Sequence, residues 1–116
     1  MRNRWVARVQ PQIHDELAAR REGDKPLWVT EIGSSSRSAA RECVTEAQHA
    51  AYLQTFLNLA RAASRSSYLR ALYAFGLRDL ARHPRDNEQP RFGLPRSDLS
   101  HKPAWWVLHD AATGKS

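Results

Sequence analysis

The stretch that decides the fold is Pro26-Leu27-Trp28-Val29-Thr30-Glu31, a short run dominated by β-branched and aromatic side chains. A Gly-Asp pair precedes it at 23–24, and Gly33 with serines at 34–36 closes it. Turn-forming residues on both sides of an apolar run are typical of a buried strand. The sequence therefore predicts a strand over 26–31, with a glutamate at its carboxyl end.

A second strand is predicted over residues 68–75, which read Tyr-Leu-Arg-Ala-Leu-Tyr-Ala-Phe. Nearly continuous apolar runs of this kind are typical of strands that are covered on both faces. Between the two strands, Thr45-Glu46-Ala47-Gln48 matches a capping box, in which the Thr and Gln side chains bond each other's backbone amides. Apolar residues then recur at helical spacing, which predicts a helix over 46–63.

Helices are also predicted on both sides of this strand–helix–strand core. Apolar residues at helical spacing predict a first helix over 4–21, or one that begins near Gln10 if Pro11 opens it. A polar, proline-containing loop is expected over 79–101. The last helix is predicted over 103–111, with Pro103 in its first turn and Ser100 as a candidate cap.

The expected fold class is therefore α/β, in the order helix, strand, helix, strand, loop, helix. Two strands joined by a helical crossover of this length should be parallel. We expect residues 1–116 to form a single unit, because a chain of 116 residues suffices for one modest core. Two parallel strands alone leave edges unpaired and faces uncovered, so the unit is expected to be part of a larger sheet or barrel.

Composition narrows the classes of function. The formal net charge is +6, but the arginines are scattered rather than grouped with aromatic residues, which disfavours nucleic-acid binding. No apolar run is long enough to predict a membrane span or a secretory signal. Cys43 is the only cysteine, and the five histidines have no ligand spacing, so neither a metal site nor a cofactor is predicted. The sequence indicates no compartment.

Glu31 is the first candidate for a catalytic side chain. Alternate side chains of a strand share a face, so Glu31 is expected to end the apolar row of Leu27 and Val29. Trp28 and Thr30 should then point the other way. In parallel α/β proteins, active sites are built at the carboxyl ends of strands, where the loops converge. An ordinary salt bridge at the surface is the alternative role for this glutamate.

Four segments in one order resemble clan-A retaining glycoside hydrolases, the superfamily of cellulases, β-xylosidases and relatives. Lys25-Pro-Leu-Trp-Val-Thr-Glu-Ile-Gly33 resembles the signature around the family's seventh strand. The others resemble the seventh helix, the end of the eighth strand, and the eighth loop and helix: Glu46–Leu53, Phe75–Asp79, and Phe92–Leu94 with Lys102–Ala104. This resemblance implies the C-terminal portion of a (β/α)8 TIM barrel.

The resemblance also implies a mechanism and a set of site residues. Glu31 would be the nucleophile of a double displacement, with a second carboxylate about 5–5.5 Å away as acid/base. Tyr73 and Phe75 could stack on a sugar ring, with core packing as their alternative. Asp79 could orient the loop backbone or bind sugar hydroxyls, with a cap or turn role as its alternative. Glu88 follows an asparagine as the acid/base does in that family, but it is expected to be a loop charge.

The sequence thus predicts a glycoside-hydrolase fragment that acts on β-linked glycans when complete. It carries the nucleophile, lacks the acid/base and is expected to be inactive alone. Its expected partners are a carbohydrate substrate and the missing N-terminal part of the barrel. One alternative is a non-catalytic interaction or sugar-binding module, and another is a basic nucleic-acid-binding protein. No membrane is expected to take part.

Overall fold

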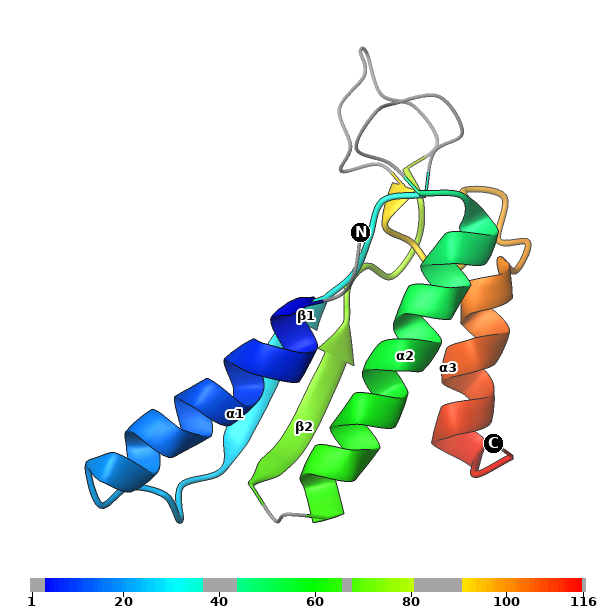
Figure 1. Cartoon of the computed structure of the whole chain (residues 1–116). Coiled ribbons are helices and arrows are strands. Elements are labelled where there is room, and N and C mark those ends of the chain that lie inside the picture. Colours follow the sequence, from blue (N-terminus) through cyan, green and yellow to red (C-terminus); the bar gives the residue numbers. More distant parts are fainter. Residues whose placement is uncertain (1–3, 37–43, 66–67, 81–90, 116) are drawn as a thin grey trace.

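The structure is a computed structural model of the whole chain and describes residues 4–36, 44–65, 68–80 and 91–115. Its elements are, in order, α1 (Arg4–Ala19), β1 (Leu27–Ile32), α2 (Glu46–Arg65), β2 (Leu69–Ala74) and α3 (Pro103–Thr113) (Figure 1). The α/β class and the element order expected from the sequence are confirmed. The bounds differ from the expected ranges by at most two residues, as element ends commonly do.

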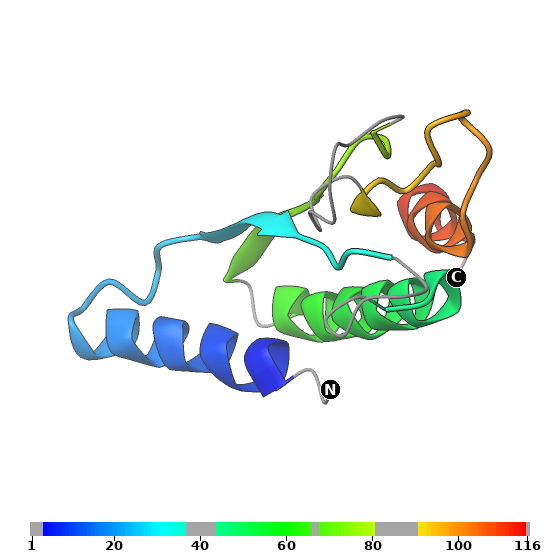
Figure 2. The same cartoon turned by 90° about the horizontal axis from the view of Figure 1, so that it is seen from above.

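The sheet consists of β1 and β2, which run parallel as predicted. Leu27 pairs with Leu69 at one end, and Ile32 pairs with Ala74 at the other. Among the described residues no third strand joins them, so these residues form no barrel. Figure 2 shows α1 and α2 on the same side of the sheet. We call the other side, which none of the described helices covers, the open face.

The core lies on the helix side of the sheet in two clusters. The first joins both strands to the middle of α2, and the second joins the start of α2 to α3. The buried members of the first are Val29, Phe56, Ala60 and Leu69, and those of the second are Ala50, Leu53, Leu94 and Ala104. Burying a side chain as large as Phe56 contributes about 1.5–3 kcal/mol to folding. These clusters fix the strands against α2 and therefore fix where the strand ends lie.

Three local expectations can be compared with the structure. The capping box of α2 is confirmed, since Thr45 N donates to Gln48 Oε1 at 2.9 Å and Gln48 N donates to Thr45 Oγ1 at 3.1 Å. Ser100 as the cap of α3 was wrong: Lys102 is the N-cap residue, and the Ser100 hydroxyl donates to Asp98 instead. The first helix does not open at Pro11 but runs through it from Arg4.

The alternation of β1 is interrupted near its carboxyl end. Val29 pairs with Leu72 and Ile32 with Ala74, so three steps along β1 match two along β2, as in a β-bulge. Ile32 packs with Val29 against the first core cluster. The expectation that Glu31 shares the face of Val29 was therefore wrong, because the bulge turns Ile32 toward α2 in its place. Glu31 is exposed and lies on the open face.

Candidate functional site

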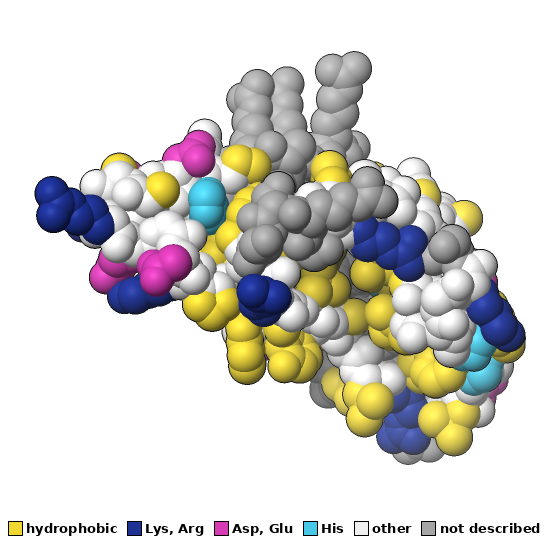
Figure 3. Space-filling model, turned by 90° about the horizontal axis from the view of Figure 1, so that it is seen from below, with side chains coloured by type: hydrophobic (Ala, Val, Ile, Leu, Met, Phe, Trp, Pro, Cys, Tyr) yellow, Lys and Arg dark blue, Asp and Glu magenta, His cyan; other side chains and the backbone are white. Residues whose placement is uncertain are grey.

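The candidate site begins with Glu31 on the open face. Tyr73 lies between the two residues of β2 that pair with Val29 and Ile32, so it is at the level of Glu31 on the neighbouring strand. Tyr73 is 51% exposed and Trp28 is 61% exposed, and their ring centroids are 6.4 Å apart. Hydrophobic side chains are also broadly exposed in the view from below, which looks along the strands from the end where they begin (Figure 3). A carboxylate beside exposed aromatic rings is a combination suited to contact with a sugar.

Phe75 directly follows β2 and lies beside the end of β1. Its backbone N–H donates to the carbonyl oxygen of Ile32 at 2.7 Å, so Phe75 and Glu31 flank the same pair of strand ends. The Phe75 ring meets Phe92 edge to face, with centroids 5.5 Å apart. Phe75 is 39% exposed, which leaves part of its ring free for a ligand. The structure thus brings three of the four predicted site residues to one end of the sheet.

Three segments pack tightly around these strand ends: residues 33–36, 75–79 and 91–95, which we call the rim. A Cβ at Gly93 would lie 2.1 Å from the backbone nitrogen of Asp79, so only glycine fits there. Backbone hydrogen bonds join the segments, including Gly76 N to Phe92 O at 3.2 Å and Ser36 N to Arg91 O at 3.1 Å. The rim is therefore a single hydrogen-bonded unit that is built from three separate segments of the chain.

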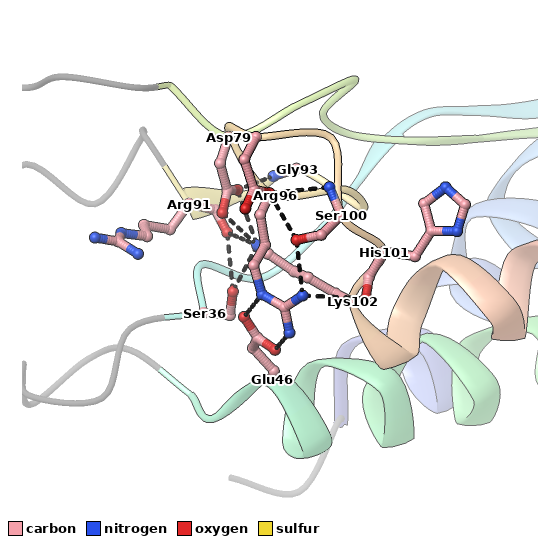
Figure 4. Close-up of polar contacts among 10 residues, drawn as sticks. Ser36, Glu46, Asp79, Arg91, Gly93, Arg96, Ser100, His101 and Lys102 are labelled. Atoms are coloured by element: carbon pink, nitrogen blue, oxygen red, sulfur yellow. Dashed lines mark hydrogen bonds and ion pairs between the residues drawn. The ribbon is translucent and has the colours of Figure 1, made fainter.

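A buried ammonium group lies at the centre of the rim (Figure 4). Lys102 Nζ lies 2.8 Å from both carboxylate oxygens of Asp79, and it donates to Ser36 Oγ at 2.8 Å and to Arg91 O at 3.1 Å. Gly93 N also donates to Asp79, at 2.9 Å. The Lys102 and Asp79 side chains are 1% and 5% exposed. A buried charge is tolerated when it is paired and hydrogen-bonded, and here it is both.

This geometry bears on the roles that the sequence allows for Asp79. Both carboxylate oxygens bond within the protein, and the side chain is buried away from the open face. The arrangement favours orientation of the loop backbone over contact with sugar hydroxyls. Asp79 thus differs from Glu31, Tyr73 and Phe75, which are exposed, in being buried and fully paired within the rim.

A second ion pair joins Arg96, which directly follows the rim, to the start of α2. Arg96 donates from Nε and NH2 to both carboxylate oxygens of Glu46, at 2.9 and 2.5 Å. Arg96 also donates to His101 O at 3.2 Å, close to the start of α3 (Figure 4). Hydrogen bonding by Arg96 lowers the pKa of the Glu46 carboxyl. A carboxylate in the first turn also suits the positive end of the helix dipole.

His49 is buried in α2 beside this charged cluster. Burial lowers its pKa, the charge of Lys102 lowers it further, and Asp79 and Glu46 act in the opposite direction. Its Nδ1 atom is buried and has no hydrogen-bond partner in the described part of the chain. A neutral imidazole is the form that suits such a site, because a second cation near Lys102 would be poorly solvated.

Sequence reasoning had not singled out Lys102 or Ser36 as polar partners. Lys102 is 66 residues from Ser36 and 23 from Asp79 in the chain, so no local pattern connects them. A lysine directly before a helix-opening proline was the one signal available. Cys43 and Glu88 lie outside the described residues. Within the described part of the chain, no cluster of potential metal ligands is present and no helix could cross a membrane.

Comparison with known proteins gives matches among solved structures only. No protein-family model matches the chain, and no curated protein matches its sequence. A family 39 glycoside hydrolase from the gut symbiont Bacteroides cellulosilyticus WH2 is similar over 94% of this chain and 19% of its own, with 28% identity and a TM-score of 0.59.

Two β-glucuronidases are also similar in fold. That of Faecalibacterium prausnitzii matches 93% of this chain and 19% of its own, with 15% identity and a TM-score of 0.60. That of Bifidobacterium dentium, in complex with coumarin-3-O-glucuronide, matches 92% and 18%, with 18% identity and a TM-score of 0.62. The chain therefore has the fold of part of a glycoside hydrolase and spans about a fifth of the length of these proteins.

Proposed function

We propose that the chain is a C-terminal part of a retaining glycoside hydrolase and supplies its nucleophile, Glu31. The single observation that carries the proposal is the position of Glu31: an exposed carboxylate at the carboxyl end of a parallel strand, which the pairing of β1 with β2 turns to the open face. The similarity to the family 39 enzyme supports a glycosidase over other α/β proteins. Carbohydrate is accordingly the proposed substrate class.

In the proposed reaction the Glu31 carboxylate attacks the anomeric carbon of a β-linked glycan and forms a glycosyl–enzyme intermediate. A second carboxylate protonates the departing oxygen and then activates the water that releases the sugar. The two groups must lie about 5–5.5 Å apart for this retaining mechanism. The described residues offer no carboxylate facing Glu31 in that way, so the acid/base is proposed to come from the preceding part of a barrel, and this chain to be inactive alone.

Tyr73 and Phe75 are proposed to contact the sugar. Tyr73 is level with Glu31, and Phe75 adjoins it through the bond between the two strand ends. Aromatic faces stack on the apolar face of a sugar ring, which would hold the anomeric carbon near the carboxylate. Asp79 is proposed to act indirectly, by holding the backbone of Gly93 and the ammonium group of Lys102.

A chimera would test this proposal. Residues 1–116 would replace the matching segment of the Bacteroides cellulosilyticus enzyme, and hydrolysis of aryl β-glycosides would be measured. We expect the chimera to be active and Glu31→Gln to reduce its kcat at least about a thousandfold, since the amide cannot act as nucleophile. Glu16→Gln is the matched control, because Glu16 is an exposed glutamate on α1 paired with Arg20.

A covalent label would identify the nucleophile directly. A 2-deoxy-2-fluoro glycoside slows the second step of the double displacement, so the sugar should remain attached to the peptide that contains Glu31. Mass spectrometry of the digested chimera would locate it. Equal rates for the chimera and its Glu31→Gln variant, or a label on another residue, would exclude Glu31 as the nucleophile.

The alternative of a sugar-binding module without hydrolysis is favoured by the exposed rings of Trp28 and Tyr73. Calorimetric titration of the 116-residue chain with oligosaccharides would distinguish it. Binding by the chain alone, lost in Trp28→Ala, would support a module. Binding seen only in the chimera would support the enzyme.

A further inference from the structure

Lys102 has a position that the proposed reaction does not explain. Its side chain is 1% exposed, although lysine is among the residues that are rarely fully buried. The ammonium group has three hydrogens to donate, and it bonds Ser36, Asp79 and the carbonyl of Arg91. Each of these partners belongs to a different segment of the rim. One side chain therefore joins the loop after β1, the loop after β2 and the segment that leads into α3.

The loop after β1 connects this ammonium group to the candidate nucleophile. Ser36 lies shortly after Glu31 in the chain, and its N–H and hydroxyl both bond Arg91 O, at 3.1 and 3.2 Å. Between them, Gly33 packs directly on Phe75, where a Cβ would lie 2.5 Å from the Phe75 carbonyl oxygen. A shift of the loop at Ser36 would thus be transmitted along a short, tightly packed backbone to the end of β1.

A buried ion pair is a costly way to gain stability. Desolvation of two charges offsets most of their attraction, and apolar residues of similar volume are often as stabilising. The pair does supply geometric specificity, because its hydrogen bonds form only when the donor and acceptor atoms are correctly placed. The ammonium group at the junction of three loops is therefore better explained by the need to fix the positions of these loops than by a gain in folding stability.

We propose that Lys102 is a positioning residue of the candidate site. By holding Ser36, Asp79 and Arg91 together, it fixes the loop that follows Glu31 relative to the loop that follows Phe75. The role of Lys102 in catalysis rests on the proposed function, whereas its role in holding the rim together does not. The described hydrogen bonds of the Lys102 ammonium group go to Ser36, Asp79 and Arg91 and not to Glu31, so it acts on the site through the loops.

Amide hydrogen exchange of the full chain would test this role. In Lys102→Met, which keeps the length of the stem but removes the charge, we expect the Ser36 and Gly93 amides to exchange at least about tenfold faster. Amides in the middle of α2, such as that of Phe56, should keep their rates. Lys115→Met is the matched control, because Lys115 is exposed at the end of the chain.

A second variant separates the positioning role of Lys102 from its effect on folding stability. Lys102→Met with Asp79→Leu removes both charges, so no buried charge is left unpaired. We expect the amides of α2 to keep their rates in this variant too while those of the rim still exchange faster, and the side-chain carboxyl ¹³C signal of Glu31 should shift in both variants. If Lys102→Met alone does not fold, Ser36→Ala removes one bond of the ammonium group and should still speed exchange at the Val44 amide, which bonds Ser35 O.

The outcomes are distinct from those for the glycosidase. Rates that rise equally in α2 and the rim, or a rim restored by the double variant, would overturn the positioning role. Lys102→Met in the active chimera should lower kcat at least about tenfold while KM changes little, because the site is displaced rather than removed. If Lys102→Met loosens the rim but Glu31→Gln leaves the rate of the chimera unchanged, Glu31 is excluded as the nucleophile and the positioning role stands.

Discussion

Gly33 packs so closely on Phe75 that a Cβ at position 33 would lie 2.5 Å from the Phe75 carbonyl oxygen. The contact is with backbone, which cannot turn aside as a side chain can. It lies just beyond Glu31 and beside the bond from Phe75 N to Ile32 O. The glycine of the Glu-Ile-Gly sequence therefore has a physical reason: only a residue without Cβ lets the ends of the two strands meet.

Gly33→Ala should separate these strand ends and lower stability. Overpacking of a tight contact costs about 1–3 kcal/mol, and urea unfolding followed by circular dichroism would measure it. Gly76→Ala is the matched control, because a Cβ there would meet only Phe92 Cβ at an ordinary 3.9 Å. Similar losses for both variants would show that the close approach at Gly33 is not what matters.

The buried ion pair between Asp79 and Lys102 predicts that a small substitution of Asp79 lowers the free energy of unfolding strongly. Asp79→Asn keeps the shape but leaves the buried ammonium group without its counter-charge, which should cost about 3–5 kcal/mol. Asp110→Asn offers a comparison, because Asp110 pairs with His109 at 3.1 Å in a half-exposed position and should cost less than about 1 kcal/mol. Unfolding midpoints of the two variants would then differ widely, and equal midpoints would contradict the burial of the charge.

Local patterns predicted most of the fold, because they act between near neighbours. The capping box joins residues three apart, and the helices and strands follow from the spacing of apolar side chains. The bulge in β1 was not predictable, because it depends on how a second strand pairs with the first. The same holds for Lys102, whose partners are distant in sequence. The position of Glu31 at the strand end was predicted, whereas the face that it occupies was not.

The capping box itself makes a modest prediction. Thr45→Ala removes the acceptor for Gln48 N–H at the start of α2 and should cost about 1 kcal/mol. Thr55→Ala serves as its control, because Thr55 is exposed within the same helix and bonds only the carbonyl of Ala51. That change should be neutral or slightly stabilising, given the helix propensity of alanine. Thermal unfolding of both variants would reveal the difference.

His49 predicts how stability depends on pH. Burial, and then the charge of Lys102, lower the pKa of His49 in the folded chain. The unfolded state, in which the usual pKa is about 6.5, therefore takes up the proton more readily. The contribution of His49 is fully present above about pH 6.5 and is lost as the pH falls through the lowered, folded-state value.

Urea unfolding at a series of pH values would measure this dependence. His49→Leu has no imidazole to titrate, so its stability should change less than that of the parent chain as the pH falls below about 6.5. The comparison concerns the slope with pH, so any loss of packing in the variant does not obscure it. If the free energy of unfolding changes with pH equally in the two proteins, protonation of His49 does not cause the loss of stability.

The final prediction concerns the two faces of β1. It determines how a loss of activity caused by substitution of Glu31 can be interpreted. Ile32 packs on the core cluster beside Val29, so Ile32→Ala should cost about 1–3 kcal/mol. Glu31 is exposed, so Glu31→Gln should change stability by less than about 0.5 kcal/mol. Regular alternation without the bulge would give the opposite order, which urea unfolding of the two variants would detect. Ile32, and not Glu31, holds the end of the strand in place. If Glu31→Gln leaves stability unchanged, a chimera that this substitution inactivates has therefore lost a chemical group and not its fold.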